Sequence, residues 1–253
     1  MPRSKELVFD HVEGVLFDKD GTLIDFVATW VPAYVAAAEA AAEQAGDKAL
    51  ADTLLVRTGY DRERDHMEPS SLLAGGTNQE LLAVWAEVLG PAAPDDMETM
   101  VLDLFEAFAA DTLVQTADLP HLFTTLSGHG LKLGIATNDD TNTAHETARS
   151  TGIDHLVDFV AGADAGHGGK PGPGMPLAFC EKTGLQPHQV ILVGDTPTDA
   201  ATGRNAGLHA VVGVLSGAAG HELLDAHFDA VIDTVADLPD LLGLPSKPPP
   251  GGD

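Results

Sequence analysis

The chain has 253 residues, with 39 acidic and 13 basic side chains, a formal net charge of −26 at pH 7 and 44% hydrophobic residues. Its length suits one large domain, or a core domain with an insertion. A surface with this much negative charge repels nucleic acid and anionic membranes, and we therefore expect neither as a partner. An anionic small molecule could bind only where the site supplies local positive charge.

The ends of the chain and its cysteine content bear on the compartment. No run of 18 apolar residues occurs, and the N-terminal stretch "MPRSKELVFDH" has charges but no apolar signal region. We therefore expect neither a membrane span nor a secretory leader. The one cysteine, Cys180, excludes an internal disulfide and favours a reducing, cytoplasmic compartment. Both a monomer and a homodimer remain open.

Strand-like apolar runs alternate with helical patterns along most of the chain. This alternation predicts an α/β fold with a Rossmann-like parallel sheet covered by helices on both faces. The predicted strands are 12–18, 131–138, 156–164, 190–195 and 209–215, with a weaker one at 229–233. The predicted helices are 119–129, 141–151, 174–184, 198–206 and 234–242.

The segment 26–116 has a different sequence pattern. It is rich in alanine, its apolar residues recur with the period of a helix, and it contains no convincing strand. We interpret it as an all-helical cap domain inserted after the first strand. The core domain then comprises 7–25 and 117–245. The tail 246–253 is rich in proline and glycine, and we expect it to be disordered.

Polar side chains follow the predicted strands, at the edge where open parallel sheets bind ligands. They are Asp18 and Asp20 after the first strand, Thr137 and Asn138 after the second, Lys170 in the loop after the third, and Asp195 and Asp199 after the fourth. Asp18 and Asp20 repel each other unless positive charge lies between them. Carboxylates suit Mg²⁺, and a lysine with a hydroxyl suits phosphate oxygens. The pattern predicts a site for a divalent cation and a phosphate.

Four motifs carry a resemblance to a known family: "DKDGT" at 18–22, "ATN" at 136–138, Lys170 in "GGKPGP", and "GDTPTD" at 194–199. Together, in this order, they resemble the haloacid dehalogenase superfamily, in its phosphatase branch. Within that superfamily the chain looks most like the phosphoglycolate phosphatases, which carry a helical cap after the first strand. The resemblance implies Mg²⁺-dependent hydrolysis of a small phosphomonoester, phosphoglycolate or a similar metabolite, through an aspartyl-phosphate.

The resemblance also implies a role for each motif residue. Asp18 is the expected nucleophile, and Asp20 the expected acid for the leaving alkoxide and then the base for water. Thr137, Asn138 and Lys170 would bind the phosphoryl group. The expected metal ligands are Asp18, Asp20 through its backbone carbonyl, Asp195, and Asp199, which would orient a metal-bound water or pair with Lys170.

Plainer interpretations compete with these roles. Asp18 and Asp20 could simply be turn formers, since Asp-Gly is a common turn signal, and Thr137 could merely cap a helix. Asp195 and Asp199 could cap the helix that begins near Pro197. Lys170, taken alone, could be an ordinary surface charge.

The cap segment "RTGYDRERDHMEPSS" concentrates cations in a chain with few of them. Arg57, Arg62 and Arg64 could bind a second anionic group of the substrate. With equal weight, they could pair with the acidic residues around them on a solvated face.

Other functions share parts of this pattern. A phosphomutase shares the aspartyl-phosphate step. A non-enzymatic receiver module uses a phosphorylated Asp with Mg²⁺, a Thr and a Lys, but it is much shorter and has no helical cap. A dehalogenase needs no acid at the second Asp position, so Asp20 argues against it.

Overall fold

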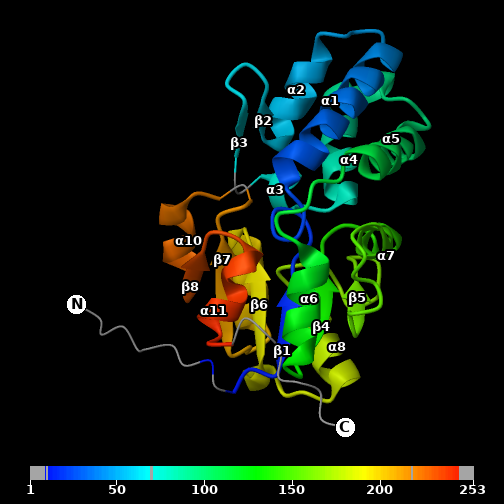
Figure 1. Cartoon of the computed structure of the whole chain (residues 1–253). Coiled ribbons are helices and arrows are strands. Elements are labelled where there is room, and N and C mark those ends of the chain that lie inside the picture. Colours follow the sequence, from blue (N-terminus) through cyan, green and yellow to red (C-terminus); the bar gives the residue numbers. More distant parts are fainter. Residues whose placement is uncertain (1–8, 10, 69–70, 218, 245–253) are drawn as a thin grey trace.

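The structure, a computed structural model, describes residue 9 and residues 11–68, 71–217 and 219–244. Within these ranges the chain forms a six-stranded sheet flanked by helices and a separate layer of helices. Figure 1 shows this helical layer above the carboxyl ends of the strands. The site predicted at the strand ends therefore faces the helical layer.

All neighbouring strands of the main sheet are parallel, in the order β5-β4-β1-β6-β7-β8. The first strand lies near the middle, where Phe17 is opposite Ile135 on one side and Val193 on the other. This arrangement confirms the predicted α/β fold. The strands are β1 (Gly14–Phe17), β4 (Lys132–Ala136), β5 (Phe159–Ala161), β6 (Val190–Gly194), β7 (Ala210–Val214) and β8 (Ala230–Ile232).

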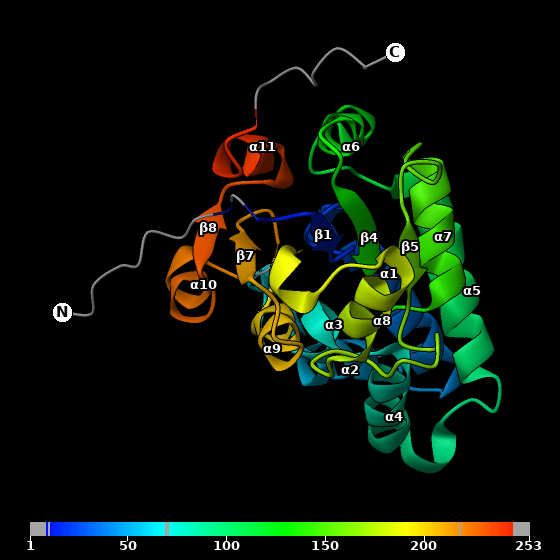
Figure 2. The same cartoon turned by 90° about the horizontal axis from the view of Figure 1, so that it is seen from below.

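The two faces of the sheet bury different hydrophobic clusters, because side chains alternate along a strand. Val15 and Phe17 belong to one cluster and Leu16 to the other. Figure 2 shows α6 and α11 over one face and α8, α9 and α10 over the other. These helices, with α7 beside β5, are α6 (Leu119–Gly128), α7 (Thr141–Ser150), α8 (Gly174–Thr183), α9 (Pro197–Asn205), α10 (His221–His227) and α11 (Leu238–Leu241).

The helical layer has a hydrophobic cluster of its own. Its longest helix buries Ala33, Ala37 and Ala41, which share one face because they are four residues apart. Small side chains on that face let neighbouring helices approach closely. The helices of this layer are α1 (Phe26–Gln44), α2 (Leu50–Thr58), α3 (Leu72–Gly75), α4 (Asn78–Leu89) and α5 (Met97–Thr112).

The chain passes between the sheet and the helical layer twice, and the two passages lie side by side. Asp25 N donates to Val114 O at 2.8 Å, and Thr116 N donates to Leu23 O at 3.0 Å. The hydroxyl of Thr116 also donates to Thr22 O at 2.6 Å. We propose that this paired passage is the boundary between the two predicted domains, 7–25 with 117–245 and 26–116.

The structure departs from the predicted elements in a few places. The segment 26–116 contains a two-stranded antiparallel ribbon, β2 (Tyr60–Asp61) and β3 (His66–Met67), so the expectation of no strand there was wrong. Strands of two residues are too short to show alternation. Helix α10 was not predicted, and the predicted helix 234–242 is a 3₁₀ turn, Val235–Asp237, followed by the short α11. The predicted tail lies outside the described residues.

Candidate active site

Asp18 lies at the carboxyl end of β1, where its backbone N–H donates to Val193 O at 2.8 Å. Lys170 Nζ lies 2.5 Å from Asp18 Oδ1 and 2.6 Å from Asp199 Oδ1. The Lys170 side chain is only 3% exposed, so water screens these charges weakly. The structure thus joins three predicted residues, which follow three different strands, in one ion-paired cluster.

Asn138 holds Lys170 through its backbone. Lys170 N donates to Asn138 Oδ1 at 2.7 Å, and Asn138 Nδ2 donates to Lys170 O at 3.3 Å. The neighbouring Thr137 is buried, and its hydroxyl accepts the backbone N–H of Asp139 at 3.1 Å. Thr137 and Asn138 both line the cavity described below, and their predicted contacts with substrate stay predictions.

Three buried carboxylates meet beside Lys170. Among the described residues, Asp18, Asp195 and Asp199 each offer an oxygen, and these oxygens lie within 4.8 Å of one another. Burial raises the pKa of the Asp18 carboxyl to about 7; the Lys170 ammonium opposes this rise, and the carboxylates of Asp199 and Asp20 add to it. A divalent cation would offset the excess negative charge, and Mg²⁺ prefers such oxygen ligands. The donor set fits Mg²⁺, whose binding stays a prediction.

Asp199 combines two of the roles considered from the sequence. One oxygen pairs with Lys170, and the other accepts from Thr196 N at 3.1 Å and from the Thr196 hydroxyl at 2.7 Å. These contacts cap the first turn of α9. The cap fixes the carboxylate, so Asp199 is positioned to hold Lys170.

Two glycines enclose the Asp195 carboxylate. A Cβ atom at Gly21 or at Gly217 would overlap that carboxylate. Gly21 also has a φ of 80°, a backbone conformation that favours glycine. The glycine after the two aspartates of the first motif therefore lets the backbone approach Asp195 closely.

Asp20 has contacts of its own, which the three-carboxylate cluster does not share. Trp30 Nε1 donates to Asp20 Oδ1, and Lys19 Nζ lies 2.7 Å from Asp20 Oδ2 and 3.0 Å from Asp139 Oδ2. Lys19 is fully buried; burial alone would lower its pKa, but the two carboxylates raise it above its usual value. The positive charge that the two aspartates required is thus divided, because Lys170 pairs with Asp18 and Lys19 pairs with Asp20. A metal contact through the Asp20 carbonyl stays a prediction.

A cavity of about 270 Å³ lies between the sheet and the helical layer. Its sheet wall, as we call the side that follows the strands, is polar: Asp18, Thr137, Asn138, Lys170, Thr196 and Asp199. Its helical wall is mostly apolar and largely aromatic, with one side-chain amide: Phe26, Trp30, Tyr34, Leu73, Ala74, Gly76, Asn78, Leu102 and Phe105. Asp20 lies where the two walls meet.

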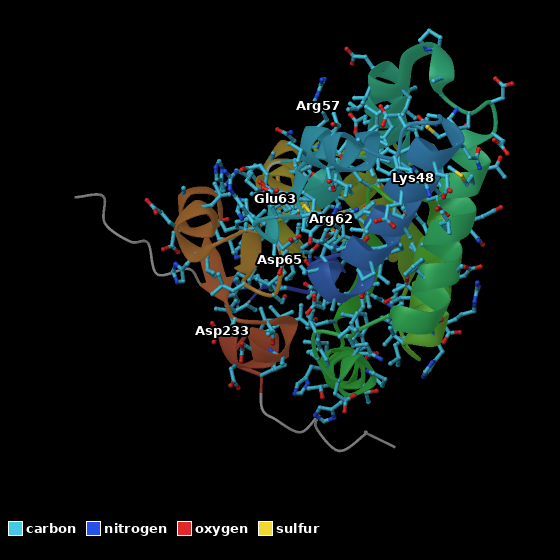
Figure 3. All side chains as sticks on the ribbon, turned by 90° about the horizontal axis from the view of Figure 1, so that it is seen from above. Lys48, Arg57, Arg62, Glu63, Asp65 and Asp233 are labelled. Atoms are coloured by element: carbon cyan, nitrogen blue, oxygen red, sulfur yellow. The ribbon has the colours of Figure 1, made fainter. Side chains whose placement is uncertain are left out.

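The three cap arginines do not line this cavity. Arg62 pairs with Glu39 at 2.9 Å and with Asp52 at 3.3 Å, both on the surface. Arg64 is 81% exposed and pairs with Asp61. Figure 3 looks down on the side of the helical layer that faces away from the sheet, where Arg57 and Arg62 are labelled. The solvated-face interpretation fits this placement, and we leave the arginines out of the proposed site.

Sequence reasoning missed four residues that connect Asp20 to its surroundings: Lys19, Trp30, Asn78 and Asp139. Asn78 Nδ2, at the start of α4, donates to Asp139 Oδ1 at 3.2 Å. A signal existed for Lys19, because a lysine between two aspartates at a buried strand end invites an ion pair. Trp30 and Asn78 come from the helical layer, and their contacts depend on how that layer sits on the sheet.

Comparison with known proteins identifies a hydrolase family and several phosphatases that are similar to this chain. The model of the haloacid dehalogenase-like hydrolase family matches residues 12–207. A phosphoglycolate phosphatase from Rhodospirillum rubrum is 32% identical over 149 residues, which cover 58% of this chain and 60% of that protein. A phosphoglycolate phosphatase from Escherichia coli K12 is 28% identical over 258 residues, which cover 94% of this chain and 95% of that protein.

Solved structures share the fold across both layers. The crystal structure of a predicted phosphoglycolate phosphatase from Haemophilus somnus aligns with a TM-score of 0.68, covering 91% of this chain and 98% of that one. Its sequence identity is 20%, so this likeness concerns the fold alone. The family match itself spans most of the chain and all four motifs. The chain therefore belongs to the haloacid dehalogenase-like hydrolase family, as those motifs predicted.

Proposed function

We propose that this protein is a Mg²⁺-dependent phosphatase that hydrolyses a small phosphomonoester through an aspartyl-phosphate on Asp18. The observation that carries the proposal is the buried contact of 2.5 Å between Asp18 and Lys170 within a cluster of three carboxylates. A carboxylate with a lysine and a cation site beside it can approach an anionic phosphate without prohibitive repulsion.

In the first step, an oxygen of Asp18 attacks phosphorus and the bond from phosphorus to the leaving oxygen breaks. Asp20 gives its proton to that oxygen. In the second step, Asp20 takes a proton from water, and the water oxygen attacks phosphorus and displaces Asp18. Lys170 and Thr137 would hold the phosphoryl oxygens during both steps.

Asp18, Asp195 and Asp199 are the side chains that would hold Mg²⁺ or its water. The ion, when bound, supplies positive charge that stabilises the developing charge of the transferred group. Asn138 would act indirectly, because its two hydrogen bonds hold the backbone of Lys170.

Further observations bear on the natural substrate and on the cellular compartment. The curated relatives are named phosphoglycolate phosphatases, and that metabolite was also the first expectation from the sequence. No helix among the described residues is long and apolar enough to cross a membrane. The single cysteine is buried and unpaired, which supports a reducing compartment such as the cytoplasm.

Metal removal and one variant test the proposal. Steady-state release of phosphate from a phosphomonoester should fall to background in excess EDTA and return with Mg²⁺. Calcium should inhibit, because it prefers more ligands and looser geometry. Asp18→Asn should lower kcat at least about a thousandfold, because the nucleophile is lost.

The matched control is Asp25→Asn, which changes a carboxylate that only caps α1. It should keep nearly full activity. Undiminished turnover in EDTA, or an active Asp18→Asn enzyme, would contradict the proposal. Release of free phosphate from a single substrate, with no need for a bisphosphate, would distinguish a phosphatase from a phosphomutase.

A further inference from the structure

We propose that this site accepts phosphomonoesters whose leaving group is uncharged and has an apolar face, and that it discriminates against a leaving group with a carboxylate, including that of phosphoglycolate. The inference rests on the proposed function, since it assigns the part of the substrate that lies beyond the phosphate. It follows from the shape and charge of the helical wall.

The helical wall is built of rings that pack against one another. Phe26, Trp30 and Tyr34 are four residues apart on α1, so all three point to the same side of the helix. Phe105 of α5 meets Trp30 and Tyr34 edge to face, with centroids 6.1 Å and 5.0 Å apart. All four rings are buried. A leaving group opposite Lys170 would therefore contact ring faces and edges, which suit apolar groups.

The cavity holds no spare positive charge for a second anion. Among the described residues that line it, the only basic side chain is Lys170, and two carboxylates already engage it. Lys19, which does not line the cavity, is likewise shared between Asp20 and Asp139. A carboxylate brought into this space would lose its water without gaining a cation, which is costly.

Further acidic groups line the cavity near the helical wall: Asp139, Asp140 and Glu146. They belong to the loop before α7 and to α7 itself. Their charges would repel a carboxylate and leave a neutral group unaffected. The net charge of −26 on the whole chain acts in the same direction.

The N-termini of two helices also open towards the cavity, but each already carries its own acidic group. Thr77 and Glu80 form a capping box at α4. The Asp140 carboxylate accepts from Thr143 N at 2.8 Å and from its hydroxyl at 2.7 Å at the start of α7. The Glu80 and Asp140 carboxylates each accept from one backbone N–H and place a negative charge at the helix N-terminus, which disfavours a further anion there.

The basic residues of the helical layer face elsewhere. Lys48, Arg57, Arg62 and Arg64 are all exposed, and none lines the cavity. Lys48 pairs with Glu43 at 2.7 Å on the surface. Lys48 and Arg57 are labelled in Figure 3, which looks down on the side of the helical layer that faces away from the sheet.

Two pairs of substrates that differ in one charge test the inference. Phosphoglycolate is compared with phosphoglycolamide, and 4-carboxybenzyl phosphate with benzyl phosphate, at saturating Mg²⁺. We expect kcat/KM to be at least about tenfold higher for the neutral member of each pair, because the carboxylate of the charged member would be buried without a cation. Equal values, or a preference for the charged members, would overturn the inference while leaving the phosphatase proposal intact.

Binding of phosphonate analogues separates this inference from the proposed function, because it needs no turnover. Benzylphosphonate with Mg²⁺ should stabilise the protein against heat at lower concentration than 4-carboxybenzylphosphonate does. If the neutral analogue binds better but none of the four esters is hydrolysed, the inference stands and the phosphatase proposal fails. If the carboxylated analogue binds equally well or better, the inference is wrong.

A lysine placed in the helical wall should reverse the preference. The test variant is Leu102→Lys, because Leu102 is partly buried and lines the cavity. The control is Val56→Lys, which adds the same charge on α2 at a position that is 57% exposed. Leu102→Lys should raise the ratio of kcat/KM for phosphoglycolate over phosphoglycolamide at least about tenfold. Val56→Lys should leave that ratio unchanged. An equal response of the two variants would mean that the wall does not set the preference.

Discussion

The sheet wall and the helical wall face each other across one cavity, but they differ in charge and in what holds their side chains. On the sheet wall, Asp18, Lys170 and Asp199 are fixed by ion pairs, and each follows a different strand of the sheet. On the helical wall, Trp30, Tyr34 and Phe105 are held by packing within a separate hydrophobic cluster. Each wall keeps its geometry by a different kind of interaction.

This difference assigns the two walls different tasks. Phosphoryl transfer needs fixed charges around phosphorus, and the strand ends provide them with little freedom to move. Recognition of the leaving group needs only shape and the right polarity. Because the helical layer has its own hydrophobic cluster, Tyr34 and Phe105 are held by packing within that layer, whereas Trp30 also donates to Asp20 on the sheet side.

After the nucleophile Asp18, Asp20, where the walls meet, should show the largest effect on turnover. Asp20→Asn should lower kcat on an alkyl phosphate by on the order of a hundredfold to ten-thousandfold, because the alkoxide leaves unprotonated and water lacks its base. A nitrophenyl phosphate needs little protonation, so only its second step should suffer. We expect a burst of about one nitrophenolate for each site, with phosphate trapped on Asp18 and detected by mass spectrometry.

The control for this experiment is the wild-type enzyme with the same nitrophenyl ester, which should show no burst if its second step is fast. A mutant that is equally slow on both substrates, with neither burst nor adduct, would show that Asp20 shapes the site without carrying a proton. Asp20 would then act as a fixed charge, as we propose for the residues of the sheet wall, and not as an acid or base.

Lys19 pairs with Asp20 and Asp139 and lies over the Trp30 ring of the helical wall, so its loss should reduce stability. Lys19→Met leaves the carboxylates of Asp20 and Asp139 buried without their cation. Removing one partner of a buried ion pair costs about 3–5 kcal/mol of unfolding free energy. Urea unfolding measures this, and adding Asp139→Asn to Lys19→Met should restore part of it. A loss below about 1 kcal/mol would contradict the buried pairing.

The residues of the sheet wall were predictable from the sequence for a physical reason. Parallel strands are buried, so their apolar runs are visible, and the residues that follow them meet at one edge whatever the connections do. Asp18, Thr137, Lys170 and Asp195 could be placed near one another in this way. The positions of the strands also followed, within a few residues.

The helical wall could not be predicted in the same way. Phe26, Trp30 and Tyr34 have the spacing of a buried helix face, and that spacing is the same whether the face packs on other helices or lines a cavity. The cluster of cap arginines was visible, but the side of the helical layer on which it would lie was not. The β2–β3 ribbon, with two residues in each strand, has no detectable period.

The stability of the protein should depend on pH, because the carboxylates of the sheet wall lie close together. The pKa of Asp18 is raised from 3.8 to about 7 without metal, so the folded state retains a proton that the unfolded chain releases. This contribution to stability is complete below about pH 4 and is lost as the pH rises towards 7, at up to about 1.4 kcal/mol for each pH unit.

Asp18→Asn removes this titration and so serves as the comparison. Without metal, urea unfolding from pH 5 to pH 8 should show the wild type losing stability relative to Asp18→Asn. Added Mg²⁺ should offset that loss in the wild type alone, because the ion binds the ionised carboxylate. Parallel curves for the two proteins would mean that Asp18 ionises in the folded state at its ordinary pKa.

The smallest effects should come from the outer surface of the helical layer. Arg57→Ala, Arg62→Ala and Arg64→Ala should each change kcat/KM for phosphoglycolate by less than about twofold, since exposed ion pairs contribute little. The same assay on Leu102→Lys is expected to show a large change, so the two results together locate the side of the layer that contacts the substrate. A selective loss of about tenfold or more for phosphoglycolate in any arginine variant would mean that this residue reaches the cavity during turnover. The helical wall would then be only part of the surface that selects the leaving group.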